Sequence, residues 1–257
     1  MTTAEALISG VIQGATEFLP VSSSGHLVLV HSFFGFSAGS NIFFDLCLHA
    51  ATLMAVILFF WRDIAAFARD RDVKEITCFI IGTVPAVVCA LLFEDRIEQF
   101  FMSPAKVMWM LVVTAFILFA GQAALLRKER PEKRLTPGTS LFVGAAQAFA
   151  LIPGISRSGA TVSAGLVGGL GVEKAFRFSF LLSIPVIAGA IAYKTLTIDV
   201  KEVVGGDITG YLGGMAAAFI TGLLSLRILW WVMRGKKLYL FGIYCLSLGI
   251  AGLFFLK

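Results

Sequence analysis

Hydrophobic residues follow one another along most of this chain, and polar residues interrupt them in short stretches. Six apolar stretches are each about long enough to cross a bilayer, which takes roughly 17–25 residues in a helix. We place them at 44–61, 76–93, 107–126, 176–194, 208–229 and 238–256. Two further apolar stretches, 4–34 and 140–170, are broken by polar residues, proline and glycine. The pattern therefore predicts an all-α polytopic membrane protein with six transmembrane helices.

Composition and charge support this prediction and orient the chain. Of the 257 residues, 58% are hydrophobic and 14% are charged, whereas a soluble domain carries about 25% charged residues. Most lysines and arginines lie in three loops, 62–75, 127–139 and 230–237. The positive-inside rule places these loops in the cytoplasm, and hence the acidic loops and the C-terminus outside. Because the positive-inside rule already accounts for most of the basic residues, the net charge of +5 predicts no nucleic-acid partner. The 24 phenylalanines predict packing or lipid contact rather than an organic cofactor.

The broken stretch 140–170 lies between two cytoplasmic loops, so it must cross the membrane an even number of times. A re-entrant helical hairpin meets this condition, because irregular backbone is tolerated at membrane depth where it lines a cavity. The same interpretation of 4–34 places the N-terminus outside. We therefore expect two re-entrant helical hairpins beside the six transmembrane helices.

The two broken stretches also resemble each other. At one offset, Gln13, Ser22, Ser24 and Gly25 match Gln147, Ser156, Ser158 and Gly159. Each half of the chain then consists of one hairpin followed by three spans, and an odd number of spans gives the halves opposite topology. We predict a single integral membrane domain, 1–257, built from an inverted-topology repeat of residues 1–130 and 138–257. Such repeats place a binding site near the midplane, at discontinuous helices.

The polar residues of the first broken stretch form the motif QGATEFLPVSSSGH, residues 13–26. Gln13 and Glu17 are four residues apart and share one helix face. Pro20 disfavours helix at the residue before it, so it ends this helix, and the three serines at 22–24 can cap the next one. An unpaired Glu17 is costly at membrane depth, which indicates a functional site.

The second broken stretch repeats this design in the motif PGISRSGAT, residues 153–161. Pro153 and Gly154 break the chain, and residues 156–158 open a new helix. Two helix N-termini that face one cavity offer N–H groups and positive dipole ends to an anion. The planar guanidinium of Arg157 matches phosphate oxygens. The residues therefore predict an oxyanion site, with phosphate favoured over carboxylate because the donors are many.

Two titratable residues of the first motif, Glu17 and His26, are candidates for proton chemistry. Glu17 can accept a proton, position water or bind a divalent cation such as Mg²⁺, which prefers carboxylate and phosphate oxygens together. His26 can relay a proton to a leaving group or deprotonate a serine. The serines can also serve as helix caps alone. We interpret Asp45 and His49, four residues apart at the outer end of a span, first as a structural pair.

At these two motifs the sequence resembles the bacterial undecaprenyl-diphosphate phosphatases, the family linked to bacitracin resistance. The stretch EFLPVSSSGH at 17–26 is similar to the first signature of that family, and PGISRSGAT at 153–161 is similar to the second. Length and hydropathy fit along the whole chain. The first signature often begins with Glu at the position of Gln13, which reduces the support for a metal site with two carboxylates here.

The resemblance implies a hydrolase of the bacterial cytoplasmic (inner) membrane, with inverted repeats, re-entrant helices, an active site open to the outer face and a tendency to form homodimers. Its lipid substrate would be the C55 polyprenyl diphosphate, hydrolysed to the monophosphate and inorganic phosphate with help from a divalent cation, Mg²⁺ or Ca²⁺. This reaction recycles the lipid carrier of cell-wall synthesis. By the same resemblance, the residues aligned with activity are Glu17, Ser23, His26, Ser156, Arg157 and Thr161.

Together, the motifs and the resemblance define one predicted site. The predicted catalytic residues are Glu17, Ser23, His26 and Arg157, and Glu17 is also the predicted metal ligand. The predicted phosphate-binding residues are Gln13, Ser22, Ser24, Gly154, Ser156, Ser158, Gly159 and Thr161. Ser23, or a water in its place, would attack the terminal phosphorus, and Glu17 or His26 would take the proton. The main rival is a polyprenyl-phosphate flippase or another inverted-repeat anion transporter, which would use the same site without chemistry.

Overall fold

The computed structural model describes six ranges of the chain. These are residues 2–34, 42–70, 72–101, 103–127, 134–197 and 208–255. Within them the regular secondary structure is helical and no strand occurs, in agreement with the all-α prediction. The helices of the first half are α1 (Thr3–Phe18), α2 (Ser23–Phe34), α3 (Ile42–Phe59), α4 (Trp61–Asp70), α5 (Val73–Leu92), α6 (Glu94–Phe101) and α7 (Pro104–Leu125). Those of the second half are α8 (Pro137–Phe149), α9 (Arg157–Val167), α10 (Val172–Thr197), α12 (Ile208–Arg234) and α13 (Tyr239–Phe255).

Each of the six predicted transmembrane stretches falls on a helix. By length and composition, α5, α7, α10 and α12 can cross a membrane. α3 meets this test together with α4, from which it is bent by 67°, and α13 is a shorter apolar helix. The described ranges thus contain four candidate spans, or five if the bent pair is one span. These apolar helices indicate a multi-pass membrane protein.

Two stretches that we expect to be loops are helical instead. Residues 61–70 form α4 and residues 94–101 form α6. Both helices carry acidic residues in their first turn, Asp63 in α4 and Glu94 and Asp95 in α6. Negative charge at this position is favoured by the helix dipole. Both helices are short and polar, so a search for apolar stretches misses them.

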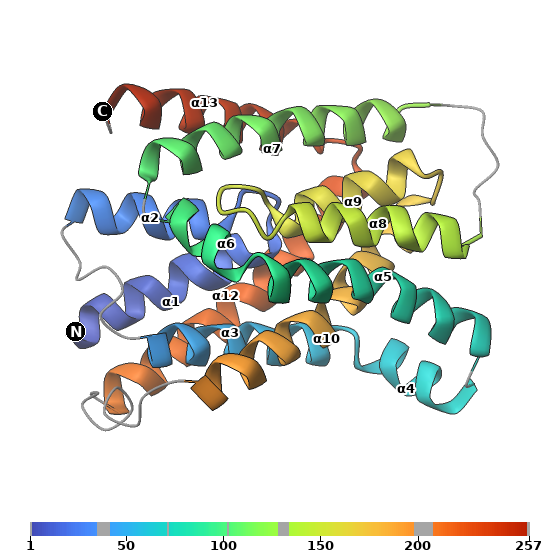
Figure 1. Ribbon diagram of the computed structural model, residues 1–257, viewed down its shortest axis with the longest axis horizontal. Coiled ribbons are helices and arrows are strands. Elements are labelled where there is room, and N and C mark those ends of the chain that lie inside the picture. The colour runs from blue at the N-terminus through green and yellow to red at the C-terminus, as the bar shows by residue number, and fades with distance from the viewer. Residues whose placement is uncertain are drawn as a thin grey trace.

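The two broken stretches form helical hairpins. A turn at 19–22 joins α1 to α2, and a turn at 150–156 joins α8 to α9. In Figure 1 the first hairpin enters from the left end of the molecule and the second from the right end. Their turns meet near the middle, where two hydrogen bonds and an ion pair described below connect them.

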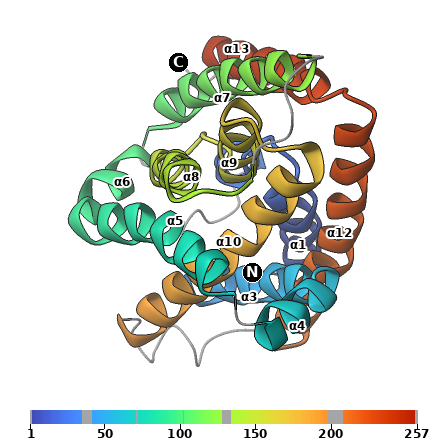
Figure 2. The same cartoon turned by 90° about the vertical axis from the view of Figure 1, so that its right-hand side faces the viewer.

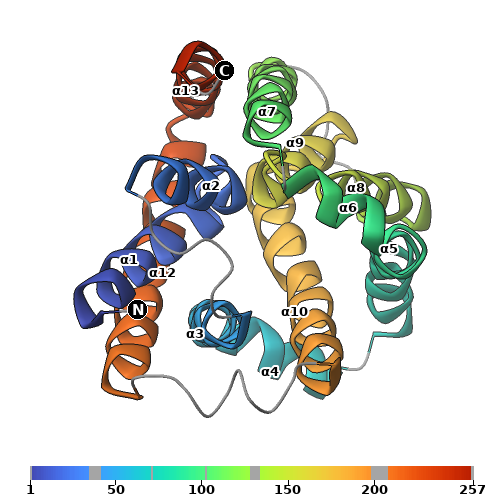
Figure 3. The same ribbon diagram turned by 60° about the vertical axis from the view of Figure 1, so that its left-hand side comes forward.

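The helices of the two halves correspond in order. α1 and α8 begin at Thr3 and Pro137, and α2 and α9 begin at Ser23 and Arg157, so both pairs start 134 residues apart. The halves also interlock: α1 packs along α12, α8 along α5, and α7 along α13 (Figures 2 and 3). Each hairpin is therefore held by a long helix from the opposite half.

Glycines permit two of these crossings. A Cβ atom on Gly10 of α1 would lie 2.1 Å from the carbonyl oxygen of Gly214 in α12. One on Gly144 of α8 would lie 2.4 Å from the carbonyl oxygen of Gly82 in α5. A side chain does not fit at either crossing, which is the usual reason for small residues between membrane helices. Gly10 and Gly144 are again 134 residues apart, and each faces a glycine of the opposite half.

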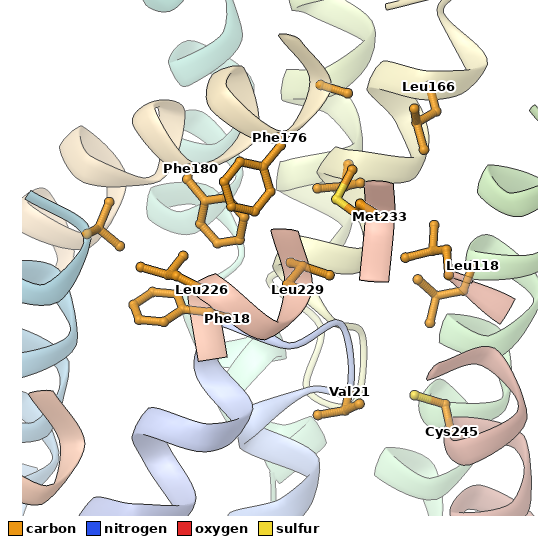
Figure 4. Close-up of a cluster of buried hydrophobic side chains, with 14 of the residues drawn as sticks. Phe18, Val21, Leu118, Leu166, Phe176, Phe180, Leu226, Leu229, Met233 and Cys245 are labelled. Atoms are coloured by element: carbon orange, nitrogen blue, oxygen red, sulfur yellow. The ribbon is translucent and has the colours of Figure 1, made fainter. Parts of the chain in front are cut away.

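Aromatic and aliphatic side chains form a core beside the turns (Figure 4). Phe18, at the end of α1, meets Phe180 of α10 edge to face, with ring centroids 5.8 Å apart. Leu226 and Leu229 of α12 are fully buried in the same cluster. This packing fixes the end of α1 against α10, and with it the polar residues next to Phe18.

The basic segments gather at one end of the molecule. α4, the end of α7, the start of α8 and the junction between α12 and α13 lie toward the right in Figure 1, whereas the start of α1 and the end of α13 lie at the left. The three loops predicted to be cytoplasmic are thus on one side. Residues 71 and 128–133 of these loops, and 198–207 of an acidic loop, lie outside the described residues.

Candidate functional site

The first turn is set by Pro20 and by the backbone of Ser22. α1 ends at Phe18, and Leu19 before the proline is extended, with φ −63° and ψ 143°, as proline requires of its predecessor. Ser22 has φ +68°, in the left-handed region. Its hydroxyl accepts a hydrogen bond from the N–H of Gly25 at 3.3 Å, which caps the start of α2.

The second turn repeats the serine cap but has its left-handed residue two positions before it. Gly154 has φ +94°, and a Cβ atom there would lie 2.3 Å from the carbonyl oxygen of Val107, so the position requires glycine. Ser156 is the N-cap of α9, and its hydroxyl accepts from the N–H of Gly159 at 3.2 Å. The hydroxyls of Ser156 and Ser158 are 3.2 Å apart. The equivalent hydroxyls of the first turn, those of Ser22 and Ser24, are 3.1 Å apart.

Hydrogen bonds hold the second turn against the first and against α7. The N–H of Gly154 donates to the hydroxyl of Ser24 at 3.2 Å. Thr114 of α7 donates its hydroxyl to the carbonyl oxygen of Gly154 at 2.9 Å and accepts from the N–H of Ser156 at 3.1 Å. The starts of α2 and α9 are therefore fixed close together, as the motifs predict.

A charged pair connects the two halves at this point. Nη2 of Arg157 lies 2.9 Å from Oε1 of Glu17, and the hydroxyl of Ser23 donates to Oε2 of Glu17 at 2.9 Å. The amide nitrogen of Gln13, one turn earlier in α1, donates to the same oxygen at 3.2 Å. The side chains of Arg157 and Glu17 are 16% and 8% exposed, so each charge offsets part of the cost of burying the other. Glu17, Ser23 and Arg157, predicted as catalytic, thus lie within one hydrogen-bonded cluster.

Arg157 keeps donor capacity that the protein does not use. Its Nη1 is buried and has no hydrogen-bond partner among the described residues, although buried donors are normally bonded. The guanidinium carbon lies 5.9 Å from the ring centroid of Phe180, and this cation–π contact helps to hold the side chain in place. Nη1 and the N-terminus of α9 are therefore available to an anion.

His26 is one turn beyond Ser23, but it bonds to other groups. Its Nδ1 lies 2.8 Å from the carbonyl oxygen of Ser22, and its Nε2 lies 2.7 Å from the hydroxyl of Tyr244 on α13. The rings of His26 and Tyr244 are stacked, with centroids 5.6 Å apart. The fourth predicted catalytic residue therefore connects α2 to α13.

Several predicted phosphate-binding residues are buried and bonded within the turns. Ser158 and Thr161 are fully buried. The hydroxyl of Ser158 donates to the carbonyl oxygen of Leu19 at 3.2 Å. The hydroxyl of Thr161 donates to the carbonyl oxygen of Arg157 at 2.8 Å and bonds to the hydroxyl of Ser179. These contacts order the start of α9, and direct phosphate contact by the two hydroxyls stays a prediction.

The sequence does not reveal two further residues of this region, and it offers contact of His49 with the site only as the less favoured alternative to a pair with Asp45. Thr114 and Tyr244 are hydroxyl residues within apolar stretches, and nothing in their spacing marks them. His49, interpreted above as the partner of Asp45, also reaches the site, because its Nδ1 lies 3.2 Å from the amide nitrogen of Gln13. The available signal for His49 was a histidine inside a span, where a polar residue usually has a polar partner.

A cation in this site would have to share Glu17 with other ligands. The described residues contain no group of three or more His, Cys, Asp and Glu side chains that could hold a metal ion. Glu17 nevertheless offers carboxylate oxygens beside Arg157, where phosphate oxygens are expected. These residues do not form a metal cage by themselves. They fit a cation that would take Glu17 as its protein ligand and most of its other ligands from phosphate oxygens.

Comparisons with known proteins match nearly the full chain. Residues 6–251 match the protein family described as "Bacitracin resistance protein BacA". An undecaprenyl-diphosphatase from Pelotomaculum thermopropionicum is 38% identical over 263 residues, covering 98% of this chain and 96% of that protein. Proteins of the same name from Korarchaeum cryptofilum and Moorella thermoacetica are 39% and 35% identical, over 98% and 100% of both chains respectively. Each relative thus aligns across both hairpins and all of the long helices.

Proposed function

This chain belongs to the bacitracin resistance protein BacA family, and on that premise we propose that it is a membrane-embedded undecaprenyl-diphosphatase. The reaction hydrolyses undecaprenyl diphosphate to undecaprenyl phosphate and inorganic phosphate, which returns the lipid carrier to cell-wall synthesis. The family and the names of the relatives support this substrate. The geometry of the two turns supports the assignment of the site.

The contact between Arg157 and Glu17 carries the proposal. It joins two residues 140 positions apart, from α9 and α1, at 2.9 Å. A guanidinium with an unbonded Nη1 at the start of a helix is suited to binding phosphate oxygens. A carboxylate that accepts a hydrogen bond from Ser23 is suited to activating a nucleophile. Phosphate binding and proton transfer, the two tasks of a phosphatase, are therefore adjacent.

In the mechanism that we propose, the terminal phosphate binds Arg157 and the N-terminus of α9 and displaces Glu17 from the guanidinium. The released carboxylate accepts the proton of Ser23, or of a water in its place, as that oxygen attacks the terminal phosphorus. The bond from this phosphorus to the bridging oxygen breaks, and undecaprenyl phosphate leaves. With Ser23 as the nucleophile, water then hydrolyses the phosphoserine and releases inorganic phosphate.

The hydrogen bonds favour Glu17 over His26 as the group that takes the nucleophile's proton. The Ser23 hydroxyl already donates to Glu17 at 2.9 Å, whereas both ring nitrogens of His26 are engaged by Ser22 and Tyr244. Hydrolysis of the anhydride releases a proton at neutral pH, and we assign His26, as a neutral imidazole, to the uptake of that proton after the chemical step.

The divalent cation, Mg²⁺ or Ca²⁺, belongs to the same proposal. Glu17 would hold it together with oxygens of the diphosphate, because hard cations prefer oxygen ligands. When bound, it supplies positive charge to the phosphate oxygens of the transition state. Arg157 would still orient the terminal phosphate, and Ser23 would still lie within reach of Glu17.

We further propose that the chain is one domain with inverted repeats, six transmembrane helices and two re-entrant hairpins. The 134-residue spacing of corresponding helix starts, and of Gly10 and Gly144, supports the repeat. The basic segments at one end support a cytoplasmic side by the positive-inside rule. The remaining details of the proposal, the bacterial inner membrane, a site open to the outer face and a homodimer, come from the resemblance of the two motifs alone.

A polyprenyl-phosphate flippase is the alternative, since inverted repeats with broken helices also describe transporters. Purified protein in detergent separates the two, because an enzyme releases phosphate from undecaprenyl diphosphate without a sealed membrane. We expect one inorganic phosphate per lipid, loss of activity with a chelator, and recovery with Mg²⁺ or Ca²⁺. An inactive detergent sample whose vesicles move labelled lipid phosphate between leaflets would establish the carrier instead. Activity that is insensitive to the chelator would remove the cation from the mechanism but leave the hydrolase.

A further inference from the structure

Tyr244 is a residue of α13 that the mechanism above leaves without a role. Its hydroxyl lies 2.7 Å from Nε2 of His26, and the two residues are 218 positions apart. Their rings are nearly parallel, at 7°, with centroids 5.6 Å apart. Tyr244 is 45% exposed, so it combines a fixed contact to the site with access from the surface of the protein.

The hydrogen bonds of His26 define which ring nitrogen carries the proton. The carbonyl oxygen of Ser22 can only accept, so Nδ1 at 2.8 Å must donate to it. In a neutral imidazole, Nε2 then has a lone pair, and the hydroxyl of Tyr244 donates to that lone pair. Stacking and the two hydrogen bonds together restrict the ring to one orientation.

We propose that Tyr244 is a positioning residue of the site, which holds His26 as the neutral Nδ1–H tautomer with Nε2 facing α13. This inference rests on the proposed function, because the tautomer decides which nitrogen of His26 takes up the proton that hydrolysis releases. Nε2 is then the nitrogen that takes up and releases the proton. Without the Tyr244 hydroxyl the ring is held at Nδ1 alone, so it can turn away from the Ser22 carbonyl, and other ring orientations and the opposite tautomer become populated.

The packed helices α7 and α13 each hold one of the two turns in place. α7 fixes the second turn through Thr114, which bonds to Gly154 and Ser156. α13 fixes the first turn through Tyr244 and His26. Because α7 and α13 pack along each other, the same pair of helices holds both turns in position.

The activity test uses Tyr244→Phe, which keeps the ring and its stacking but removes the hydroxyl. We expect kcat to fall about five- to tenfold, the equivalent of one hydrogen bond, while KM changes by less than about twofold because Tyr244 does not touch phosphate. Tyr239→Phe is the matched control: Tyr239 is also on α13 and 39% exposed, and its variant should match the wild type. In a His26→Ala background, Tyr244→Phe should have no further effect, because Tyr244 acts through His26.

A spectroscopic test reads the tautomer itself and needs no activity. The chain has three histidines, so proton–nitrogen correlation spectra of ¹⁵N-histidine-labelled protein in detergent are simple, and His26→Ala assigns the His26 signals. We expect the Nδ1–H tautomer for His26 in the wild type and a shift toward Nε2–H in Tyr244→Phe, with no change in Tyr239→Phe. If Tyr244→Phe retains wild-type kcat and His26 signals, or loses activity with the tautomer unchanged, the positioning role is wrong. If the wild type releases no phosphate, the function on which this role depends fails, whatever the spectra show.

Discussion

At the scale of single residues, the site depends on how two buried charges are satisfied. Glu17 accepts hydrogen bonds from Arg157, Ser23 and Gln13, whereas Arg157 retains an unbonded Nη1. A buried ion pair adds little net stability, because desolvation consumes much of the attraction. The incomplete bonding of Arg157 is therefore better explained by a ligand than by folding, and an anion bound at Nη1 would complete it.

The role of Ser23 can be tested by trapping the intermediate. If Ser23 is the nucleophile, acid quenching during the first turnover of substrate labelled on the terminal phosphate leaves label on the peptide that contains Ser23. Ser23→Ala should abolish the label and lower kcat by roughly 10⁶, the order found when a hydrolase loses its nucleophilic serine. Ser103→Ala, at the start of α7 and outside the site, should label like the wild type. An active wild type without label would make water the nucleophile.

The sequence predicts the charged residues of the site better than their neighbours. Glu17 and Arg157 stand out because each is expensive in an apolar segment, and the structure pairs them. Tyr244 and Thr114 carry no such cost, since a hydroxyl within a helix can bond to its own backbone. Their function depends on which distant helix lies opposite, and a single sequence contains no direct information about that.

At the scale of helices, breaks and ends explain the architecture. Proline ends α1, and left-handed backbone at Ser22 and Gly154 reverses the chain, so both turns could be predicted from residue types. The short helices α4 and α6 could not, because their polar composition resembles that of loops. α6 is tied to α10 by Glu94, which accepts from Nζ of Lys194 at 2.8 Å and from the hydroxyl of Tyr193 at 2.9 Å.

This tie predicts a pH-dependent contribution to stability. The hydrogen bond from Lys194, with a further one from Tyr193, holds the pKa of the Glu94 carboxyl below its ordinary value of 4.5. Ionised Glu94 therefore stabilises the fold above that value, and the contribution is lost as the pH falls through the lowered pKa.

The corresponding measurement compares thermal unfolding of Glu94→Gln with the wild type in detergent. At pH 7 the variant should unfold lower by at most about 2–4 °C, since a partly exposed ion pair contributes no more than about 1 kcal/mol. The gap should close in acid. Asp95→Asn, which removes an exposed charge from the same helix turn, should show only the smaller gap that the helix dipole explains. An equal gap at both pH values for Glu94→Gln would refute the assignment of the stability to the ionised carboxylate.

At the scale of the whole molecule, the function depends on two halves that each supply part of one site. A repeat is predicted from a few matched residues, and the starts of two pairs of helices, α1 with α8 and α2 with α9, have the same 134-residue spacing. The packing of each hairpin against the opposite half could not be predicted, because a glycine indicates a close approach without naming its partner. The interlocked arrangement explains how residues as distant as Glu17 and Arg157 meet.

The most direct test of this account is phosphate release from undecaprenyl diphosphate by Arg157→Ala in detergent. Loss of one charged group that binds the transition state typically costs a factor of about 10²–10³ in rate, and we predict a loss of that size. The control is Arg227→Ala, which removes an exposed arginine of α12 and should keep wild-type activity, with both variants eluting and unfolding like the wild type. Near-normal phosphate release by folded Arg157→Ala would contradict the claim that the two halves form one hydrolytic site.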